Sequence, residues 1–503
     1  MRKTRTRILC GIAALLLTSG YSRAQAPAAP AQTDNRPPAD PPHQRSGEVG
    51  WRLSPQDRKY AAIDGARLKQ YVADQTAISR KYRDQGHQFW GRIIGTSADA
   101  ENAQWMLDKF KQFGLTDVHE QMFDLPPQWM PQSWSVSGSR DGKIVNLNTA
   151  QPTYQSPGTS AAGLDVEAVY VGQGSDAEFN LAPDVRGKAV FITSFDLLSR
   201  HIGTSEGAIK RAADRGAAAI FVAVAIPQTN YKTQFYPVQT NVPTFTLGAM
   251  DGLAIRDLIG SSPSGPPARV KIALDVQMAP NLKSGTVWGT LPGLSDEVVY
   301  VVGHRDAWFE GADDNAAGVA TLVGLAEYFS KIPKAQRHRT IIFLGTTGHH
   351  NSGGQSGAWL SAHPEIFAKA ALLLNCEHTG TVDATWNLAI PNTILPTNAL
   401  QPVTWYAGGS SKLVEIVDKA LTAMGVPTET NSQTRGGGEI GRYYWYAPAI
   451  QFLVQGYTWH SDHETDDTIS AYGIAGVTRA YAKVIADTDK IPLKDLQRSP
   501  AGN

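Results

Sequence analysis

The sequence predicts an α/β protein: an open, mostly parallel sheet with helices on both faces, interrupted by an inserted β-rich segment. Three observations support this fold class. The chain has 503 residues, of which 42% are apolar and 18% charged, as is typical of a globular protein with more than one domain. Short apolar strands alternate with helical patterns over residues 286–490, whereas residues 150–285 contain mainly strand-like pieces. We therefore expect one α/β domain formed by residues 55–149 and 286–490, with residues 150–285 inserted.

The N-terminus has the pattern of a secretory signal. Four basic residues in MRKTRTR precede an apolar run over residues 8–17, and the small-residue pattern Ala-Gln-Ala follows at 24–26. Residues 1–24 are therefore a predicted signal peptide, too short to span a membrane. Residues 25–54, rich in Pro and Ala, are a predicted disordered linker. We expect a secreted protein, most simply one of a bacterial periplasm.

Charge and cysteine content indicate which partners and covalent links the protein is expected to lack. The 46 basic and 46 acidic residues balance, which argues against a nucleic-acid partner. Removal of residues 1–24 takes away five basic residues and no acidic ones, so 41 minus 46 gives the mature chain a net charge of −5. Only Cys376 remains after that segment, so no internal disulfide is expected. No later stretch is apolar enough to be a membrane span.

Residues 55–149 and 150–285 show secondary-structure patterns but few candidate functional residues. Ser97 is the predicted cap of a helix that ends at Gly114, because Ala103, Met106 and Phe110 fall on one face. The insert contains the strand-like EAVYVG, KAVFIT, AAIFVAV and VPTFTLG, and one helical pattern over residues 206–215. No cluster of acids or histidines accompanies them, so we expect a structural or substrate-shaping module.

Residues 286–490 contain the strands of the predicted sheet. EVVYVVGH leads into the helical AAGVATLVGLAEYFS, and TIIFLG is followed by a loop with two adjacent histidines. AALLLN precedes CEH, and the helical SSKLVEIVDKALTAMG precedes the strand AIQFLV. In an open α/β sheet, sites form beyond the carboxyl ends of the strands. These ends are therefore the expected place of a functional site.

Histidines and acids gather at these strand ends. Half of the twelve histidines lie there: His304, His349, His350, His378, His460 and His463. Acids follow the same strands: Asp306, Asp313, Asp314, Glu377, Asp462 and Glu464. A single histidine is more often an ordinary surface or hydrogen-bonding residue, but six on one rim are hard to ascribe to composition. Imidazole and carboxylate together suit zinc or a similar divalent ion, so we predict one or two Zn²⁺ ions, which a shared carboxylate could bridge.

A family resemblance rests on VVYVVGHRDAWFEGADDNAAG, residues 298–318. This segment resembles the metal-binding segment of the co-catalytic zinc aminopeptidases, and is closest to the branch of glutamate carboxypeptidase II and the transferrin receptor. The resemblance implies a zinc exopeptidase fold for the α/β domain. DVRGKAVFI, AADRGAAAIFV and VPTFTLG resemble phrases of a protease-associated domain, which the resemblance implies for residues 150–285. GRIIGTSADAENAQWMLDKFKQFGL resembles the first helical region of the family, so the likeness covers most of the chain.

The resemblance implies most of the metal site directly. His304 of GHRD would bind one metal, and Asp306 would orient that histidine. Asp314 of DDNAAG would bridge both metals. Glu377, in LLLNCEHTG, takes the place of the family's acidic ligand after the next strand.

The C-terminal part carries the last implied ligand and the candidate substrate contacts. WHSDHET selects His460 as the ligand, but the overlapping HETDDT would select His463 instead, and this alternative stays open. Trp459 stands where the family often has Tyr. Arg435 and Arg442, in TRGGGEIGRYYWYAP, could bind a substrate carboxylate, although exposed surface arginines are an equally good interpretation.

The loop TTGHHNSGG departs from the family pattern. The family carries Glu-Glu here, the first acid as general base and the second as metal ligand, and alignment places His349 and His350 at those positions. His350 can replace a carboxylate as a zinc ligand. His349 could take the proton from metal-bound water, because imidazole exchanges protons near neutral pH. Glu310, in WFEGADDN, is the alternative base.

These patterns predict a secreted metal-dependent hydrolase, an exopeptidase that cleaves peptide or small amide substrates with a metal-activated water. Aminopeptidase and carboxypeptidase specificity both stay open, as does a homodimer. Two rival interpretations follow from the missing Glu-Glu pair. One is a non-catalytic binding protein on the same fold, and the other is an enzyme of changed reaction, such as a lyase, esterase or cyclase acting on a small molecule.

Overall fold

The structure, a computed structural model, describes nine ranges of the chain between residues 52 and 498. They are residues 52–194, 203–224, 230–236, 240–261, 265–350, 355–386, 394–429, 436–454 and 456–498. The predicted signal peptide and nearly all of the predicted linker lie outside these ranges. Every helix in the described residues is too short or too polar to serve as a membrane span.

A seven-stranded sheet forms the α/β part of the fold, in the order β18-β19-β15-β12-β14-β11-β2. Its strands are β2 (Thr116–Asp124), β11 (Lys283–Leu291), β12 (Val298–His304), β14 (Thr340–Thr346), β15 (Ala370–Cys376), β18 (Thr404–Gly408) and β19 (Ala449–Leu453). The central strands β14, β12, β15 and β19 run parallel, whereas the pairings toward both edges are antiparallel. The predicted open α/β sheet is confirmed, with its parallel character confined to the centre.

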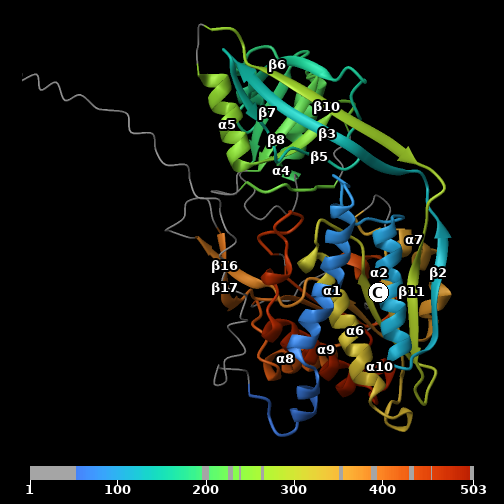
Figure 1. The fold of residues 1–503 in the computed structure, drawn as a ribbon. Coiled ribbons are helices and arrows are strands. Elements are labelled where there is room, and N and C mark those ends of the chain that lie inside the picture. The colour runs from blue at the N-terminus through green and yellow to red at the C-terminus, as the bar shows by residue number, and fades with distance from the viewer. Residues whose placement is uncertain are drawn as a thin grey trace, which may run out of the picture. The chain divides into compact units, whose positions relative to one another are not determined.

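Alternating side chains of the central strands bury both faces of this sheet. Val299 and Val301 of β12 pack with the large set of helices on one face, where α1, α2 and α6 run side by side (Figure 1). Val298, Tyr300 and Val302 pack on the other face against α7 and a 3₁₀ turn. The helices of this domain are α1 (Gly65–Asp84), α2 (Ser97–Gln112), α6 (Gly318–Ser330), α7 (Gln355–Ala362), α8 (Ser411–Ala423), α9 (Ala471–Thr488) and α10 (Leu493–Leu496). Buried parallel strands read as continuous apolar runs for this reason.

Short elements complete the domain. They are the 3₁₀ turns η2 (Arg58–Ala62), η4 (Lys334–Gln336), η5 (Pro364–Lys369), η6 (Gly438–Arg442) and η7 (Asp466–Thr468), the π turn η3 (Ala312–Ala317), and two small sheets, β1 (Gly91–Arg92) with β13 (Ala307–Trp308) and β16 (Val382–Trp386) with β17 (Ile394–Leu400). Helix α2 is capped by Thr96, whose hydroxyl accepts a hydrogen bond from the Asp99 N–H at 3.4 Å. The predicted cap Ser97 is therefore wrong by one position, since it is the first helical residue.

A second, eight-stranded sheet forms the other lobe, in the order β4-β3-β10-β6-β7-β8-β9-β5. Its strands are β3 (Gln128–Arg140), β4 (Lys143–Asn146), β5 (Gln151–Pro152), β6 (Leu164–Tyr170), β7 (Ala189–Ser194), β8 (Ala219–Val224), β9 (Thr244–Gly248) and β10 (Arg269–Ala279). Helices α3 (Asp176–Leu181), α4 (Gly203–Asp214) and α5 (Ala249–Gly260) accompany them. The sheet already includes β3, paired with β10 along its length, so it begins before the predicted boundary at residue 150. This long-range pairing, together with the packing of Trp134 and Val136 in the lobe's core, assigns β3 to the lobe.

The parallel strands bring four chain segments to one edge of the seven-stranded sheet. β12 ends at His304, and β15 ends at Cys376, next to Glu377. The loop after β14 carries His349 and His350, and the chain after β19 leads to His460. Because β12 pairs with β14 on one side and β15 on the other, these ends lie next to one another.

Arg92 anchors the segment that leads from β12 to Asp314. Its buried guanidinium donates to the carbonyl oxygens of Arg305 (2.9 Å), Glu310 (2.7 Å) and Gly311 (3.0 Å), and to the hydroxyl of Ser79 on α1 (3.0 Å). The Gly311 carbonyl also accepts the Ala316 N–H at 3.0 Å, and the Glu310 carbonyl also accepts the Ser79 hydroxyl at 3.4 Å. Arg92 therefore completes the hydrogen bonding of this buried segment and is the side-chain donor to the Arg305 carbonyl.

We expect Arg92→Met to lower the free energy of unfolding by about 2 kcal/mol or more, because the Arg305 carbonyl loses its side-chain donor and a buried carbonyl left without a donor costs about 1–3 kcal/mol. Guanidinium chloride titration followed by tryptophan fluorescence measures the change. Lys81→Ala is the control: Lys81 forms an exposed ion pair with Glu101 at 2.8 Å, worth less than about 1 kcal/mol. Equal shifts for the two variants would contradict the role of Arg92.

Candidate metal centre

The carboxylate of Asp314 is the centre of the cluster at the strand ends. Asp314 lies in η3 just before α6 and is only 2% exposed. Its Oδ1 lies 3.1 Å from Nε2 of His304 and 3.5 Å from Nε2 of His378. Its Oδ2 lies 3.1 Å from Nε2 of His350 and 2.9 Å from Nε2 of His460. Each oxygen thus faces two imidazoles, an arrangement suited to a bridging carboxylate. We call this cluster the Asp314 centre.

Two neighbours fix the position of Asp314. The carboxylate of Glu464 accepts hydrogen bonds from the backbone N–H of Asp314 (2.6 Å) and that of His460 (2.7 Å). The indole of Trp459 donates to Asp314 Oδ2 at 2.7 Å and stacks on the His460 ring at 3.7 Å. Trp459, predicted to contact substrate, therefore holds the central carboxylate.

Asp306 orients the histidines from behind. Its carboxylate accepts the backbone N–H groups of His349 (3.2 Å) and His350 (3.0 Å), and lies 3.3 Å from Nδ1 of His350. Nδ1 of His304 lies 3.2 Å from the Asp306 carbonyl oxygen and 3.7 Å from its carboxylate. Both rings are therefore held by Nδ1 and present Nε2 to Asp314. This is the usual arrangement of a carboxylate behind a metal-ligating histidine.

Glu377 presents one oxygen to the cluster. Its Oε2 accepts hydrogen bonds from the side-chain amides of Asn375 (2.6 Å) and Gln451 (3.2 Å). Its Oε1 lies 3.5 Å from Nε2 of His304. The turn at Gly438 packs directly against this carboxylate: Gly438 has a φ of +51°, and a Cβ there would lie 1.7 Å from Glu377 Oε2. Only glycine fits this turn.

His349 lies at the edge of the cluster. At 18% its side chain is more exposed than those of its histidine neighbours, and its ring stacks on that of His304 at 4.0 Å. Nδ1 of His349 lies 2.9 Å from a carboxylate oxygen of Glu439, and Nε2 lies 3.8 Å from Glu377 Oε1. A histidine held by an acid at one nitrogen, with the other facing the site, can move a proton.

The electrostatics follow from burial among many charges. Burial alone would raise the pKa of Asp314, but the imidazoles of His350, His378 and His304 hold it well below the ordinary value. Burial lowers the pKa of His460 to about 3, which favours the neutral imidazole, the form that can ligate a metal. Burial and the nearby Asp314 raise the pKa of Glu464 well above its usual range.

The donor set fits divalent metal ions. Nε2 of His304 and Oδ1 of Asp314 are buried and form no hydrogen bond with any described group, although they lie 3.1 Å apart. Two sets of donors converge: His304, Asp314 and Glu377 form what we call the first site, and Asp314, His350 and His460 form the second site. Imidazole nitrogens with carboxylate oxygens are the ligands of zinc. Within the described residues, the converging groups of candidate ligands include no residue of the eight-stranded lobe.

The structure separates the remaining predicted site residues. Glu310, the alternative base, directs its carboxylate to Arg80 at 2.6 Å. His463, the alternative ligand, is 53% exposed and stacks on Tyr231, so it does not compete with His460. Arg435 and the side chain of Arg442 lie outside the described residues.

Four neighbours of the centre were not assigned roles from the sequence. His378 and Glu464 were visible only as members of the rim, and Glu439 lies within the GGGEIGR segment without any distinguishing pattern. Tyr236 comes from the other lobe, and its ring lies 5.5 Å from that of His460 and 6.3 Å from that of His350. The adjacent Gln234 N–H donates to the His460 carbonyl at 2.9 Å. No sequence signal could predict this contact, because it joins segments more than 220 residues apart.

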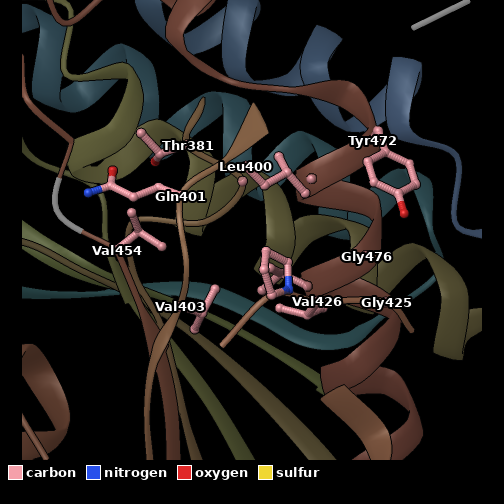
Figure 2. A pocket seen from close by; sticks show the side chains of 13 residues that line it. Thr381, Leu400, Gln401, Val403, Gly425, Val426, Val454, Tyr472 and Gly476 are labelled. Atoms are coloured by element: carbon pink, nitrogen blue, oxygen red, sulfur yellow. The ribbon is translucent and has the colours of Figure 1, made fainter. Parts of the chain in front are cut away.

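A pocket lined in part by Thr381, a neighbour of Asp313, is distinct from the Asp314 centre. Figure 2 shows Leu400, Val403 and Val426 lining it, with Thr381 on its wall. Thr381 also donates to a carboxylate oxygen of Asp313 at 2.5 Å. None of the described histidines lines this pocket, so the chemistry belongs to the Asp314 centre.

Comparison with known sequences identifies the part of the chain that carries the centre. Residues 286–485 match the sequence model of peptidase family M28. The chain is 23% identical over 257 residues to aminopeptidase YwaD of Bacillus subtilis (strain 168). That alignment covers 50% of this chain and 50% of the Bacillus protein, so this chain spans about half the length of its relative.

Solved structures share the fold. BSAP, a zinc aminopeptidase from Bacillus subtilis, is similar with a TM-score of 0.62 at 18% identity, over 86% of this chain and 98% of that one. The peptidase M28 precursor of Shewanella amazonensis SB2B is similar with a TM-score of 0.66 at 17% identity, over 89% of this chain and 100% of that one. The fold is that of the zinc aminopeptidases. Residues 286–485, which carry the centre, thus resemble the metallopeptidases of family M28 in sequence and in fold.

We expect purified protein to hold one or two zinc-like ions, and His304→Ala or Asp314→Asn to remove most of them, because each variant deletes a donor or the bridging charge. Elemental analysis after zinc loading and dialysis measures the content. His463→Ala is the matched control and should keep the full content, since this exposed histidine lies outside the centre. If the folded wild-type protein held no metal after zinc loading, the prediction of a metal centre would be wrong.

Proposed function

We propose that the protein is a metal-dependent exopeptidase whose centre uses His349 and His350 in place of the family's Glu-Glu pair. The observation that carries the proposal is the bridging position of Asp314, with two imidazoles at each carboxylate oxygen. The match of residues 286–485 to peptidase family M28 supports peptide or small amide substrates.

The residues of the first and second sites would hold the ions. When bound, divalent ions supply the Lewis acidity that activates water and polarises the scissile carbonyl. His350 occupies the position of a carboxylate ligand, and Asp306 keeps its Nε2 directed at Asp314. Replacing a carboxylate by a neutral imidazole raises the net charge of the site by one. The charge change favours an anionic attacking group and stabilises negative charge on the substrate oxygen.

His349 is the proposed general base. Its Nδ1 contacts Glu439, which would fix the tautomer and stabilise the ring when Nε2 accepts a proton. The ring is partly exposed and borders both sites, since it lies 4.0 Å from the His304 ring and 5.2 Å from the His350 ring. Glu310 is a weaker candidate, because its carboxylate is engaged by Arg80.

We also propose an identity for the eight-stranded lobe, a family branch, a cellular location and two substrate contacts. The typical phrases in residues 150–285 support a protease-associated identity for the eight-stranded lobe, and the GHRD and DDNAAG phrases support the glutamate carboxypeptidase II branch. The basic and apolar start of the chain supports export to a periplasm. Arg435 and Arg442 are kept as proposed carboxylate contacts, and a homodimer as a state to be tested by sedimentation.

The activity is tested with three peptide panels: free at the N-terminus, blocked at the N-terminus with a free C-terminus, and blocked at both ends. We expect zinc-dependent release of a terminal residue from one of the first two panels, loss of turnover after chelation, and its return with zinc. Turnover of only the doubly blocked panel would contradict an exopeptidase. Metal binding without turnover of any peptide, amide or ester would favour a binding protein.

The two adjacent histidines should separate by role. We expect His349→Ala to keep its metal and to slow turnover by about 10²–10⁴-fold, the usual worth of a general base. His350→Ala should lose metal, whereas His350→Glu should keep it because both side chains ligate zinc. His349→Glu restores a carboxylate base and should preserve turnover of peptides.

Parallel metal analysis and steady-state kinetics on the four variants make the comparison. Glu439→Gln adds a further readout, because it removes the charge behind His349 and should lower kcat with little change in KM. If His349→Ala turned over substrate like wild type, the base assignment would be wrong.

A further inference from the structure

We infer that His378 is a metal ligand that closes the first site with a fourth protein donor, leaving the open coordination position at the second site. The inference rests on the proposed function, since it takes the Asp314 centre to be a metal centre. It extends that function by distinguishing the two ions. One ion would be held by protein alone, and the other would be accessible to water and substrate.

The distances around the first site bring His378 as close to the two carboxylates as a shared ion would require, to within about 0.5 Å. Nε2 of His378 lies 3.5 Å from Asp314 Oδ1 and 3.8 Å from Glu377 Oε1. Nε2 of His304 lies 3.1 Å and 3.5 Å from the same two oxygens. Donors of a tetrahedral zinc ion with bonds of about 2.0–2.1 Å lie about 3.3 Å apart. The ligand atoms of His304, Glu377 and His378 also all lie within 4.8 Å of one another.

The backbone turns His378 into the cluster. His378 follows Glu377 directly and has a φ of +51°, a left-handed conformation that few residues other than glycine adopt. Its N–H donates to the side chain of Asn315 at 3.2 Å, and its carbonyl accepts from Val454 N–H at 3.3 Å. The side chain is only 3% exposed. Two adjacent residues, Glu377 and His378, can therefore point at the same spot, which an extended strand would not allow.

Asp313 provides the carboxylate expected behind a metal-ligating histidine. Its Oδ2 lies 3.6 Å from Nδ1 of His378, and Nδ1 forms no hydrogen bond with a described group. Asp313 is itself fixed by the hydroxyl of Thr381 (2.5 Å) and the N–H of Gly456 (3.0 Å). The His378–Asp313 pair thus parallels the pair of His350 and Asp306 at the second site.

The second site keeps three protein donors. They are Asp314 Oδ2, His350 Nε2 and His460 Nε2. Four protein ligands are typical of structural zinc sites, whereas three ligands with one open position are typical of catalytic ones. The centre therefore divides into a closed first site, which holds Asp314 in place, and an open second site.

Cobalt spectroscopy on the full chain tests position 378 directly. In His378→Cys, a thiolate at the first site should give a sulfur-to-cobalt charge-transfer band that Co²⁺-loaded wild type lacks. Wild type is the blank, because it already contains the buried Cys376. His378→Ala should weaken one of two Co²⁺ or Zn²⁺ affinities by about 100-fold or more, with the other unchanged within about 3-fold. His463→Ala should leave both affinities unchanged.

No charge-transfer band in folded His378→Cys, together with wild-type affinities in His378→Ala, would overturn the inference. If neither variant folds, the paramagnetically shifted N–H signals of Co²⁺-loaded wild type decide: four bound imidazoles support a ligand at His378, and three overturn it. These readouts do not depend on turnover. If the wild type cleaves peptides but the metal measurements exclude His378 as a ligand, the proposed function stands and the inference is wrong. If the metal measurements identify His378 as a ligand but no substrate is cleaved, only the inference stands.

Discussion

The burial of one carboxylate constrains the whole site. A buried carboxylate is costly unless it is paired and hydrogen-bonded, and Asp314 is 2% exposed. The fold meets this requirement by surrounding it with imidazoles from four separate segments, and by fixing its backbone N–H with Glu464. Parallel packing of β12, β14 and β15 is what places the ends of these segments within reach of one carboxylate. Arg92 then holds the chain between His304 and Asp314 by its carbonyl groups.

Much of this site could be predicted from the sequence because the strands are local and apolar. His304 and Glu377 follow runs of valine and leucine directly, so their position at one sheet edge follows from strand order alone. Side chains fixed by long-range packing could not be predicted. Glu310 lies only four residues from Asp314, yet Arg80 on α1 draws its carboxylate away. Glu439 and Tyr236 reach the centre from distant segments, and β3 joins its lobe through long-range pairing with β10 and packing in the core.

The two histidines after β14 each have a carboxylate behind the ring. In the zinc aminopeptidase family that this sequence resembles, two acidic residues stand at the corresponding positions, directly beside the metals. Here His350 is held by Asp306 at 3.3 Å and His349 by Glu439 at 2.9 Å, so carboxylates stand one layer further out. Each imidazole is thereby turned so that Nε2 faces the centre. More nitrogen donors and fewer carboxylates favour zinc over magnesium or calcium, which prefer oxygen ligands.

The two halves of the proposed centre differ in the side chains that surround them. His349 stacks over His304 and so covers the first site from the partly exposed side, while His378 fills it from behind. Indole and phenol rings surround the second site: Trp459 lies 3.7 Å and Trp308 4.7 Å from the His460 ring, and Tyr236, from the other lobe, lies 5.5 Å from it. Because Asp314 belongs to both sites, a rigid first site fixes the geometry of the second without occupying its open position. His349, the proposed base, lies ring to ring 5.2 Å from His350, a donor of the second site, so the proposed base borders the site to which the inference assigns the open position.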